Sequence, residues 1–337
     1  MFFTSLFCNG QDLDLKFLKD QISANNRAGK QEVSQNKLLK ILSQDDLSTL
    51  DEANLTLLMA STFRSINDYR SAINYLKKSE TLAATIPDED SLKMNIKAEM
   101  AFTYFDDRKY DLSSSIIQKI KSENYKFLDE TNHAFIIMQE GFINFLKGNY
   151  SISEEQYRSS SILLKKSSPC NLPVIMVKQM QLYAALKNFE KVDEIYKRTI
   201  KNADFCSVIK YKIYATEEIK SIYEKEKDQD KVFHFNEKLD SLNTAYNRDD
   251  KLAEMHVSNQ NFLEKETETE KRISDYYLII ALVLGSLLSV WGIYYFKKNK
   301  MHSAERSKFE EEIKILKKNF RNMLKHNFHK RVQKIIF

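Results

Sequence analysis

Apolar positions recur at intervals of three and four residues along most of the chain. Between Phe309 and Leu324, for example, they fall at 309, 313, 316, 320, 323 and 324. This is the period of an amphipathic helix that buries one face. Only six Gly and three Pro occur in 337 residues, and β-rich folds need more turn residues than that. The pattern predicts an all-α protein.

One stretch, residues 276–296, lacks the polar face of the other helices. It contains 21 consecutive residues without a charge and carries aromatic residues at both ends, where the headgroup region favours them. At about 1.5 Å per residue it would span roughly the 30 Å of a hydrocarbon core. A buried helix of a soluble protein would normally keep a polar stripe. We therefore expect a single transmembrane helix here.

Charge is unevenly distributed around that stretch. The chain carries +5 overall, but residues 297–337 hold thirteen Lys/Arg against four Glu, so the rest of the chain is acidic. Three Lys/Arg lie in the fifteen residues before the apolar stretch and five in the fifteen after it. Positive flanks favour the cytoplasmic side. We expect a single-pass protein of the bacterial inner (cytoplasmic) membrane, N-terminus extracytoplasmic and C-terminus cytoplasmic, without direct nucleic-acid binding.

The N-terminus resembles part of an export signal, whereas the cysteines indicate no particular site. Residues 1–11 look like the end of a signal peptide without its positively charged start, so we expect the true start upstream. Cys8, Cys170 and Cys206 are odd in number, far apart and form no CxxC pair. This spacing supports neither a zinc site nor a disulfide framework, so we expect incidental thiols.

An internal repeat of about 40 residues runs through the first three quarters of the chain. Each copy contains one position that we call the anchor, followed three positions later by a small or β-branched residue. The anchor is aromatic in four copies and is Gln229 in a fifth, degenerate copy. The pairs are Tyr69 and Ala72, Tyr110 and Ser113, Tyr150 and Ser153, Phe189 and Val192, and Gln229 and Val232. Successive anchors are 41, 40, 39 and 40 residues apart. Nine positions before them lie Ala60, Ala101, Gly141, Met180 and Lys220. Such regularity predicts stacked helical units.

The repeat resembles the tetratricopeptide (TPR) repeat, a helix–turn–helix in which small residues let two helices cross closely. The third copy carries the resemblance best, with Gly141, Gly148, Tyr150, Ser153 and Tyr157 in consensus-like places. No copy has the family's Trp, and the period exceeds 34. The resemblance implies a TPR-type helical-hairpin solenoid of about five repeats over 49–245, with 12–48 as a divergent N-terminal helical pair.

In this family the first helix of each pair lines a concave wall. Carrying those positions over gives Asn95, Ala98, Phe102, Phe105 and Asp106 in the second repeat, and Phe135, Met138, Phe142, Phe145 and Leu146 in the third. The strip is rich in aromatic residues, which supply anchor pockets for a helix or peptide. The predicted partner-binding residues are Asn95, Phe102, Phe105, Phe135, Met138, Phe142 and Phe145. The alternative is that these rings pack between repeats.

Two further segments flank the apolar stretch. Residues 246–275 are expected to form a juxtamembrane linker helix with the thin apolar set Leu252, Met255 and Leu263. Residues 297–337 are expected to form a basic cytoplasmic segment. Its apolar positions are close to a heptad, which suits a short coiled coil and a homodimer. The alternative is a basic amphipathic helix lying on anionic lipid.

No chemistry is predicted. The chain has no GxGxxG, P-loop or HExxH motif, and His133, His234 and His256 are isolated, so we expect no catalytic residue, metal or cofactor. A TPR array, one span and a coil resemble bacterial membrane sensors whose coil leads into a histidine-kinase core or a helix-turn-helix domain. Residues 329–334 resemble one kinase box, but Lys330 stands where the box has its phospho-accepting histidine.

The sequence therefore favours a membrane-anchored sensor or adaptor. Its extracytoplasmic array would bind a protein or peptide, and its single span would couple that event to the cytoplasm. Two alternatives remain open. One is a membrane-tethered scaffold for envelope complexes that does not signal. The other is the N-terminal part of a sensor histidine kinase.

Overall fold

The described part of the chain consists of helices joined by short turns. The structure is a computed structural model that describes residues 14–44 and 46–333, with side chains described to residue 323. It divides into one compact unit that ends at Phe262 and a second that begins at Leu263. The described residues contain helices and no strand, which confirms the all-α prediction. The predicted signal-peptide remnant, residues 1–11, lies outside the described residues.

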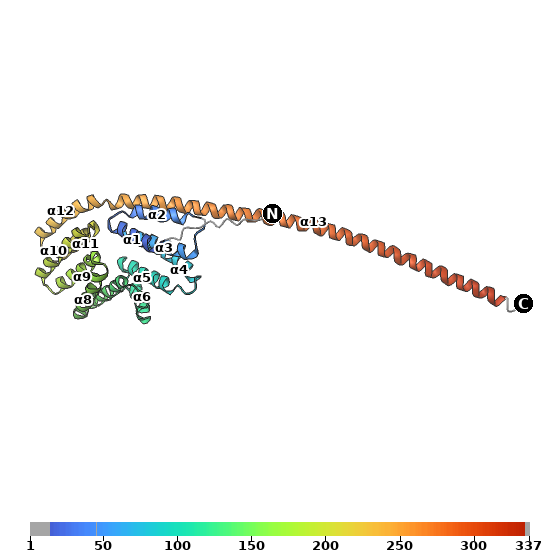
Figure 1. Cartoon of the computed structure of the whole chain (residues 1–337), viewed down its shortest axis with the longest axis horizontal. Helices are drawn as coiled ribbons and strands as arrows, with labels where there is room; N and C mark the ends of the chain where they lie inside the picture. Colours follow the sequence, from blue (N-terminus) through green and yellow to red (C-terminus); the bar gives the residue numbers. More distant parts are fainter. Residues whose placement is uncertain (1–13, 45, 334–337) are drawn as a thin grey trace. The chain divides into compact units, whose positions relative to one another are not determined.

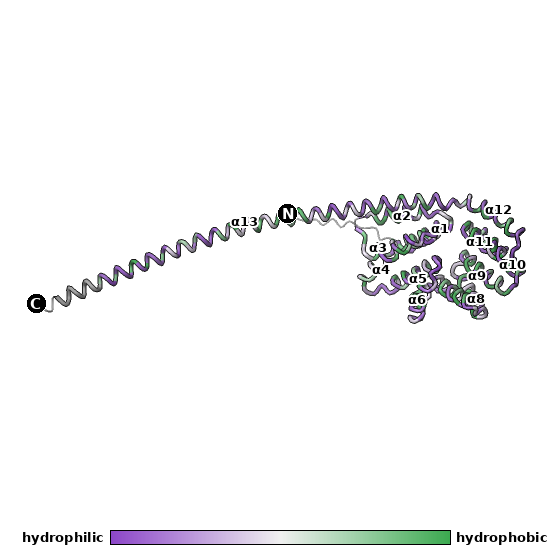
Figure 2. Tube along the Cα trace, turned by 180° about the vertical axis from the view of Figure 1, so that it is seen from behind, coloured by the Kyte–Doolittle hydropathy of each residue, from purple (hydrophilic) through white to green (hydrophobic). Residues whose placement is uncertain are grey.

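The first unit is a series of antiparallel helix pairs (Figure 1). The pairs are α1 (Leu15–Arg27) with α2 (Gln31–Leu42), α3 (Thr49–Ser65) with α4 (Tyr69–Ala84), α5 (Asp90–Asp106) with α6 (Tyr110–Ser122), α7 (Glu130–Leu146) with α8 (Tyr150–Ser167), α9 (Leu172–Ala185) with α10 (Phe189–Phe205), and α11 (Ile209–Glu226) with α12 (Gln229–Tyr246). A short 3-10 helix, η1 (Pro169–Asn171), precedes α9. Hydrophobic and hydrophilic positions are interleaved along these helices (Figure 2), as amphipathic packing requires. The helical-repeat solenoid is confirmed.

The sequence repeat corresponds to one turn that recurs at every hairpin. Each anchor (Tyr69, Tyr110, Tyr150, Phe189 and Gln229) is the first residue of the second helix of its pair. The residue two positions earlier adopts a left-handed backbone conformation in all five turns; these are Asn67, Arg108, Gly148, Lys187 and Lys227, with φ from 58° to 78°. A left-handed residue ends a helix by satisfying its last carbonyl groups. Only Gly148 takes this conformation without a side-chain penalty.

Gly141 allows a close crossing of α7 and α8 in the third repeat. A Cβ atom added there would lie 2.9 Å from Cε1 of Tyr157, whose ring is buried between α7 and α8. In the same way the residue three positions after each aromatic anchor is buried; these residues are Ala72, Ser113, Ser153 and Val192. The small and β-branched positions of the repeat therefore lie where two helices meet.

The end of the array packs against its beginning. The next helix, α13 (Arg248–Gln333), starts after Asn247, and its Met255 lies fully buried in the same hydrophobic core as residues of α1–α4. The Met255 carbonyl oxygen accepts a hydrogen bond from Gln35 Nε2 (2.7 Å), and the Tyr246 hydroxyl oxygen accepts one from Gln31 Nε2 (3.1 Å). Figure 1 shows the first turns of α13 running beside α2. Residues 246–262 therefore close the array on itself.

A disulfide bond joins Cys170 to Cys206, so the expectation of incidental thiols is wrong for this pair. Cys170 lies in η1, just before α9, and Cys206 caps α10, just before α11. Both cysteines therefore lie in connections between successive repeats. Stacking brings such connections to the same edge of the array. The two cysteines are 36 residues apart in sequence, a separation that resembles no compact disulfide motif, so the sequence did not predict the bond.

The second unit is the remainder of α13. Every described side chain from residue 267 to 323 is exposed. An 18-residue window within this helical region has a mean hydropathy of 2.0 and none of it is buried, so by length and composition it could cross a membrane. The heptad-spaced Phe309, Ile313, Leu316 and Phe320 are exposed as well.

We expect the closure of the array to contribute measurably to its stability. Met255→Ala removes a fully buried side chain and should cost about 2–4 kcal/mol, because it leaves a cavity in a packed core. Val257→Ala is the matched control, since Val257 is 61% exposed and exposed truncations cost about 0.5 kcal/mol or less. Thermal unfolding of the full chain in detergent, followed by circular dichroism, measures both. Equal melting temperatures for the two variants would contradict the closure.

Candidate binding site on the inner wall

The aromatic strip predicted as a binding wall is largely packed between helices. Phe102, Phe105, Met138 and Phe142 are buried, while Asn95, Phe135 and Phe145 are half-buried. Phe105 and Phe142 meet edge to face with ring centroids 5.2 Å apart, and Phe102 meets Phe135 at 5.8 Å. Asn95 Oδ1 accepts a hydrogen bond from Asn132 Nδ2 (3.2 Å). The rings thus hold α5 against α7, and their role in partner binding stays a prediction.

Beside this strip, a polar cluster forms where the first helices of the repeats converge. Arg64, near the end of α3, donates to Glu99 Oε1 (2.6 Å) and to Asp106 Oδ2 (2.9 Å), both on α5. Its guanidinium also lies 5.6 Å from the ring centroid of Phe102. Burial alone would lower the pKa of Arg64, but the two carboxylates outweigh it and raise this pKa. The guanidinium of Arg64 is therefore a charge of the cluster that is fully paired.

Lys178, on α9, is held by aromatic rings instead of carboxylates. Its ammonium lies 4.2 Å from the ring centroid of Phe142, 5.5 Å from that of Phe105 and 5.8 Å from that of Tyr214. The residue is only 8% exposed, and burial lowers its pKa. The three rings come from α7, α5 and α11, so this ammonium lies where four first helices meet.

Helix α11 reaches across the array to α3. Lys210 Nζ donates a hydrogen bond to the carbonyl oxygen of Ser65, 145 positions earlier in the chain. The neighbouring Tyr211 hydroxyl donates to Asn171 Oδ1 at 2.7 Å. Burial lowers the pKa of Lys210 to about 8 and raises that of Tyr211 to about 12. Helix α11 therefore contacts both α3, in the second helix pair, and the connection before α9.

Tyr214 completes the cluster, one helical turn beyond Lys210. Burial, followed by the nearby charge of Glu218, raises the pKa of its hydroxyl well above the usual value. The Glu218 carboxylate accepts a hydrogen bond from Gln181 Nε2 (2.7 Å). Tyr214 and Gln181 are both half-buried. The inner wall thus offers partly accessible polar groups on an aromatic background, as peptide-binding sites do.

We define the inner-wall cluster by the residues that face one another here: Arg64, Asp106, Lys178, Gln181, Lys210, Tyr211, Tyr214 and Glu218. Sequence reasoning missed all of them except Asp106, which had been placed on the wall by resemblance. Lys178 could have been found from the sequence, because it is the single charged residue in the helix Leu172–Ala185, whose other residues are mostly apolar or carry amides. The contacts of Lys210 leave none, since they join residues far apart in sequence.

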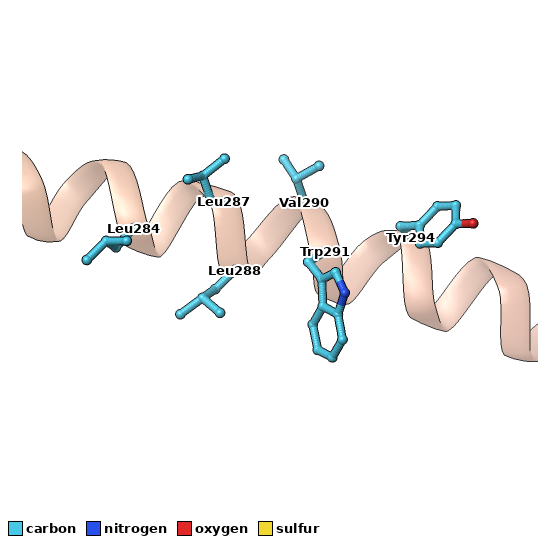
Figure 3. Close-up of a pocket in the computed structure, with 6 residues that line it drawn as sticks. All are labelled: Leu284, Leu287, Leu288, Val290, Trp291 and Tyr294. Atoms are coloured by element: carbon cyan, nitrogen blue, oxygen red, sulfur yellow. The ribbon is translucent and has the colours of Figure 1, made fainter. Parts of the chain in front are cut away.

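Other parts of the described chain offer less. Among the described residues no group of three His, Cys, Asp or Glu side chains could hold a metal ion. A hollow on α13 is lined by Leu284, Leu287, Leu288, Val290, Trp291 and Tyr294. Figure 3 shows these side chains projecting in several directions from a single helix. This hollow is therefore the open surface of an apolar helix and not an enclosed pocket.

Lys210 should give the array a measurable pH dependence. Burial, together with the nearby charges of Arg64 and Arg248, lowers its pKa from 10.5 to about 8 in the folded chain, and the charge of Asp106 opposes this shift. Between about pH 8 and 10.5 the unfolded chain therefore binds more protons at this residue, and stability should rise with pH. Lys210→Met should reduce that rise, whereas Lys201→Met, at an exposed position, should not. Melting temperatures of the full chain at pH 7.5 to 10.5 test this, and parallel profiles for all three proteins would refute it.

Comparison with known proteins gives similarity in structure only. No protein-family model and no curated protein sequence matches the chain. PlcR of Bacillus thuringiensis, solved with the peptide PapR7 and DNA, is similar over 62% of this chain and 76% of its own length, with a TM-score of 0.52 and 16% identity. A Rap protein solved with the Competence and Sporulation Factor is similar over 77% of this chain and 76% of its own, with a TM-score of 0.52 and 12% identity.

A third solved structure gives the same result. The Rap conjugation gene regulator of the plasmid pLS20, solved with a peptide, is similar over 78% of this chain and 81% of its own length, with a TM-score of 0.50 and 11% identity. At such identities the likeness shows the fold and nothing beyond it. The chain therefore has the fold of the TPR-like helical-repeat proteins.

Proposed function

We propose that the chain is a peptide- or protein-binding module, anchored in a membrane by residues 276–296, whose ligand occupies the inner-wall cluster. The observation that carries the proposal is the convergence of α3, α5, α7, α9 and α11 on one group of half-buried polar and aromatic side chains. A peptide presents backbone hydrogen-bonding groups and side chains in alternation. The polar side chains of this cluster can form hydrogen bonds with the backbone, and its aromatic rings can pack against the side chains. The role that we propose for the cluster is recognition.

The solved structures of similar fold support the choice of ligand. PlcR was solved with the peptide PapR7 and DNA, the Rap protein with the Competence and Sporulation Factor, and the plasmid regulator with the Phr* peptide. Their low identity to this chain means that no residue can be carried over from them. What transfers to the proposal is the ability of a TPR-like helical-repeat array to accept a peptide.

Membrane anchoring forms the second part of the proposal. Residues 276–296 are uncharged, and their side chains are exposed, with no packing partner among the residues that the structure describes. Exposed apolar patches of this size mark membrane or protein contacts. The basic segment after them favours a cytoplasmic C-terminus. The heptad-spaced Phe309, Ile313, Leu316 and Phe320 suit a homodimer on that side.

The disulfide supports the same topology. Disulfide bonds persist in oxidising compartments and are rare in the cytosol, so the Cys170–Cys206 bond favours an extracytoplasmic array. In this arrangement the closing segment, residues 246–262, leads directly in sequence toward the span. A ligand that changes the inner wall could therefore influence the chain that enters the membrane. This is the sensor or adaptor function, with a non-signalling scaffold as its alternative.

Binding is tested with the full chain in lipid nanodiscs and a synthetic library of random heptapeptides. We expect the wild-type chain to retain a subset of peptides, and Tyr214→Ala to weaken their binding about tenfold or more, because truncated aromatic anchors cost about 2 kcal/mol. Phe233→Ala is the control, since Phe233 is 65% exposed on α12. If peptide retention is lost in Phe233→Ala and not in Tyr214→Ala, the ligand binds outside the inner-wall cluster and the proposal is rejected.

The topology is tested by trapping thiols in living cells. We expect a membrane-impermeant maleimide to leave Cys170 and Cys206 unlabelled until reductant is added, because both lie in the disulfide. Free thiols at both positions in acid-quenched cells would indicate a reducing compartment and contradict an extracytoplasmic array.

Cys170→Ser should also lower the stability of the array by about 3–4 kcal/mol, because the disulfide no longer reduces the entropy of the unfolded chain by closing a loop of this length.

A further inference from the structure

Lys178 is a buried cation whose hydrogen-bonding capacity is unused. Among the described residues it has no hydrogen-bond acceptor and no carboxylate within ion-pair distance; three aromatic rings surround its ammonium. An ammonium has three donors, and a buried charge without a partner is costly. Cation–π contacts offset only part of that cost. The fold therefore retains a charge that destabilises it.

The nearby carboxylates do not satisfy this ammonium, because each has another partner. Glu218 and Asp106 both act on Lys178 through their charge. Yet Asp106 Oδ2 is bound to Arg64 at 2.9 Å, and Glu218 Oε2 is bound to Gln181 Nε2 at 2.7 Å. Both carboxylates are thus bonded to other residues of the inner-wall cluster, and neither forms an ion pair with Lys178 among the described residues.

Gln181 provides a second unsatisfied group on the same face of α9. It lies three residues after Lys178, so the two side chains are neighbours on the helix surface. Its Oε1 atom is buried and has no hydrogen-bond partner. Lys178 contacts Tyr214 and Gln181 contacts Glu218, four positions apart on α11. An unused donor and an unused acceptor therefore lie along one seam between α9 and α11.

We propose that Lys178 anchors a carboxylate of the bound peptide and that Gln181 Oε1 accepts a hydrogen bond from an N–H group of the same peptide. This inference rests on the proposed peptide-binding function and adds the ligand's chemistry. The carboxylate belongs either to an acidic side chain or to the peptide's C-terminus. A singly charged group fits better than a phosphate, because Glu218 and Asp106 lie close enough to repel a second negative charge.

The same reasoning gives Lys178 a signature that a packing residue would not have. Lys178→Met keeps the length of the side chain and removes its charge, leaving an apolar group among three rings. Replacing a buried, unsatisfied charge by an apolar side chain is often neutral or stabilising, and residues kept for binding commonly lower stability. We therefore expect the Lys178→Met variant to melt at or above the wild-type temperature while it loses ligand.

The experiment uses three heptapeptide libraries with the full chain in nanodiscs. The first has amidated C-termini and no Asp or Glu, the second adds free C-termini, and the third adds Asp and Glu to amidated peptides. We expect the wild type to retain one of the last two at least tenfold better than the first, and that library identifies the source of the carboxylate. Lys178→Met should abolish the preference. Lys197→Met, at an exposed position on α10, should retain it.

Three results would overturn the carboxylate anchor alone. Equal retention of all three libraries by the wild type would show that no carboxylate is recognised. A preference that survives in Lys178→Met, or a variant that melts several degrees below wild type, would show that Lys178 serves packing. These results leave the proposed function standing if bound peptides remain sensitive to Tyr214→Ala. Failure of the wild type to retain any library would instead reject the proposed function and this anchor with it.

Discussion

The packing of residues 246–262 against the first two hairpins is the contact on which the rest of the array depends. An open solenoid of TPR type holds its repeats only through nearest neighbours. Here Met255 enters the core of α1–α4, and Gln31 and Gln35 bind Tyr246 and the Met255 carbonyl group. The two ends are thereby fixed to each other. Within this unit, α11 is held close enough to α3 for Lys210 to bind the Ser65 carbonyl oxygen.

Closure explains the electrostatics of the inner wall. Charged groups on an open concave surface would be solvated and would keep ordinary pKa values. In this array, protein surrounds Lys178 and Lys210 and lowers the pKa of both, and it raises the pKa of Tyr211 and Tyr214. Arg64 keeps its charge because two carboxylates pair with it. Low solvation strengthens any interaction that a ligand makes there, which suits a recognition site.

The sequence predicts what is local and periodic. The anchors at Tyr69, Tyr110, Tyr150 and Phe189 mark the starts of the second helices because the same left-handed turn precedes each one. Gly141 reports the close crossing with Tyr157. Period alone does not give the curvature of the array, so it could not tell whether Phe105 and Phe142 face a groove or each other. The closure and the Lys210–Ser65 contact depend on that curvature, and the Cys170–Cys206 bond depends on how successive repeats stack. Each of the three joins residues that are far apart in sequence.

The central claim is that a ligand occupies the inner wall, and amide hydrogen exchange of the full chain in nanodiscs tests it most directly. A retained peptide should slow exchange in α9 and α11, whose side chains form the cluster, more than in their partners α10 and α12. Each second helix serves as the internal control for the first helix of its own repeat. Slower exchange confined to α10 and α12 would place the ligand on the other helices of these hairpins and contradict the account.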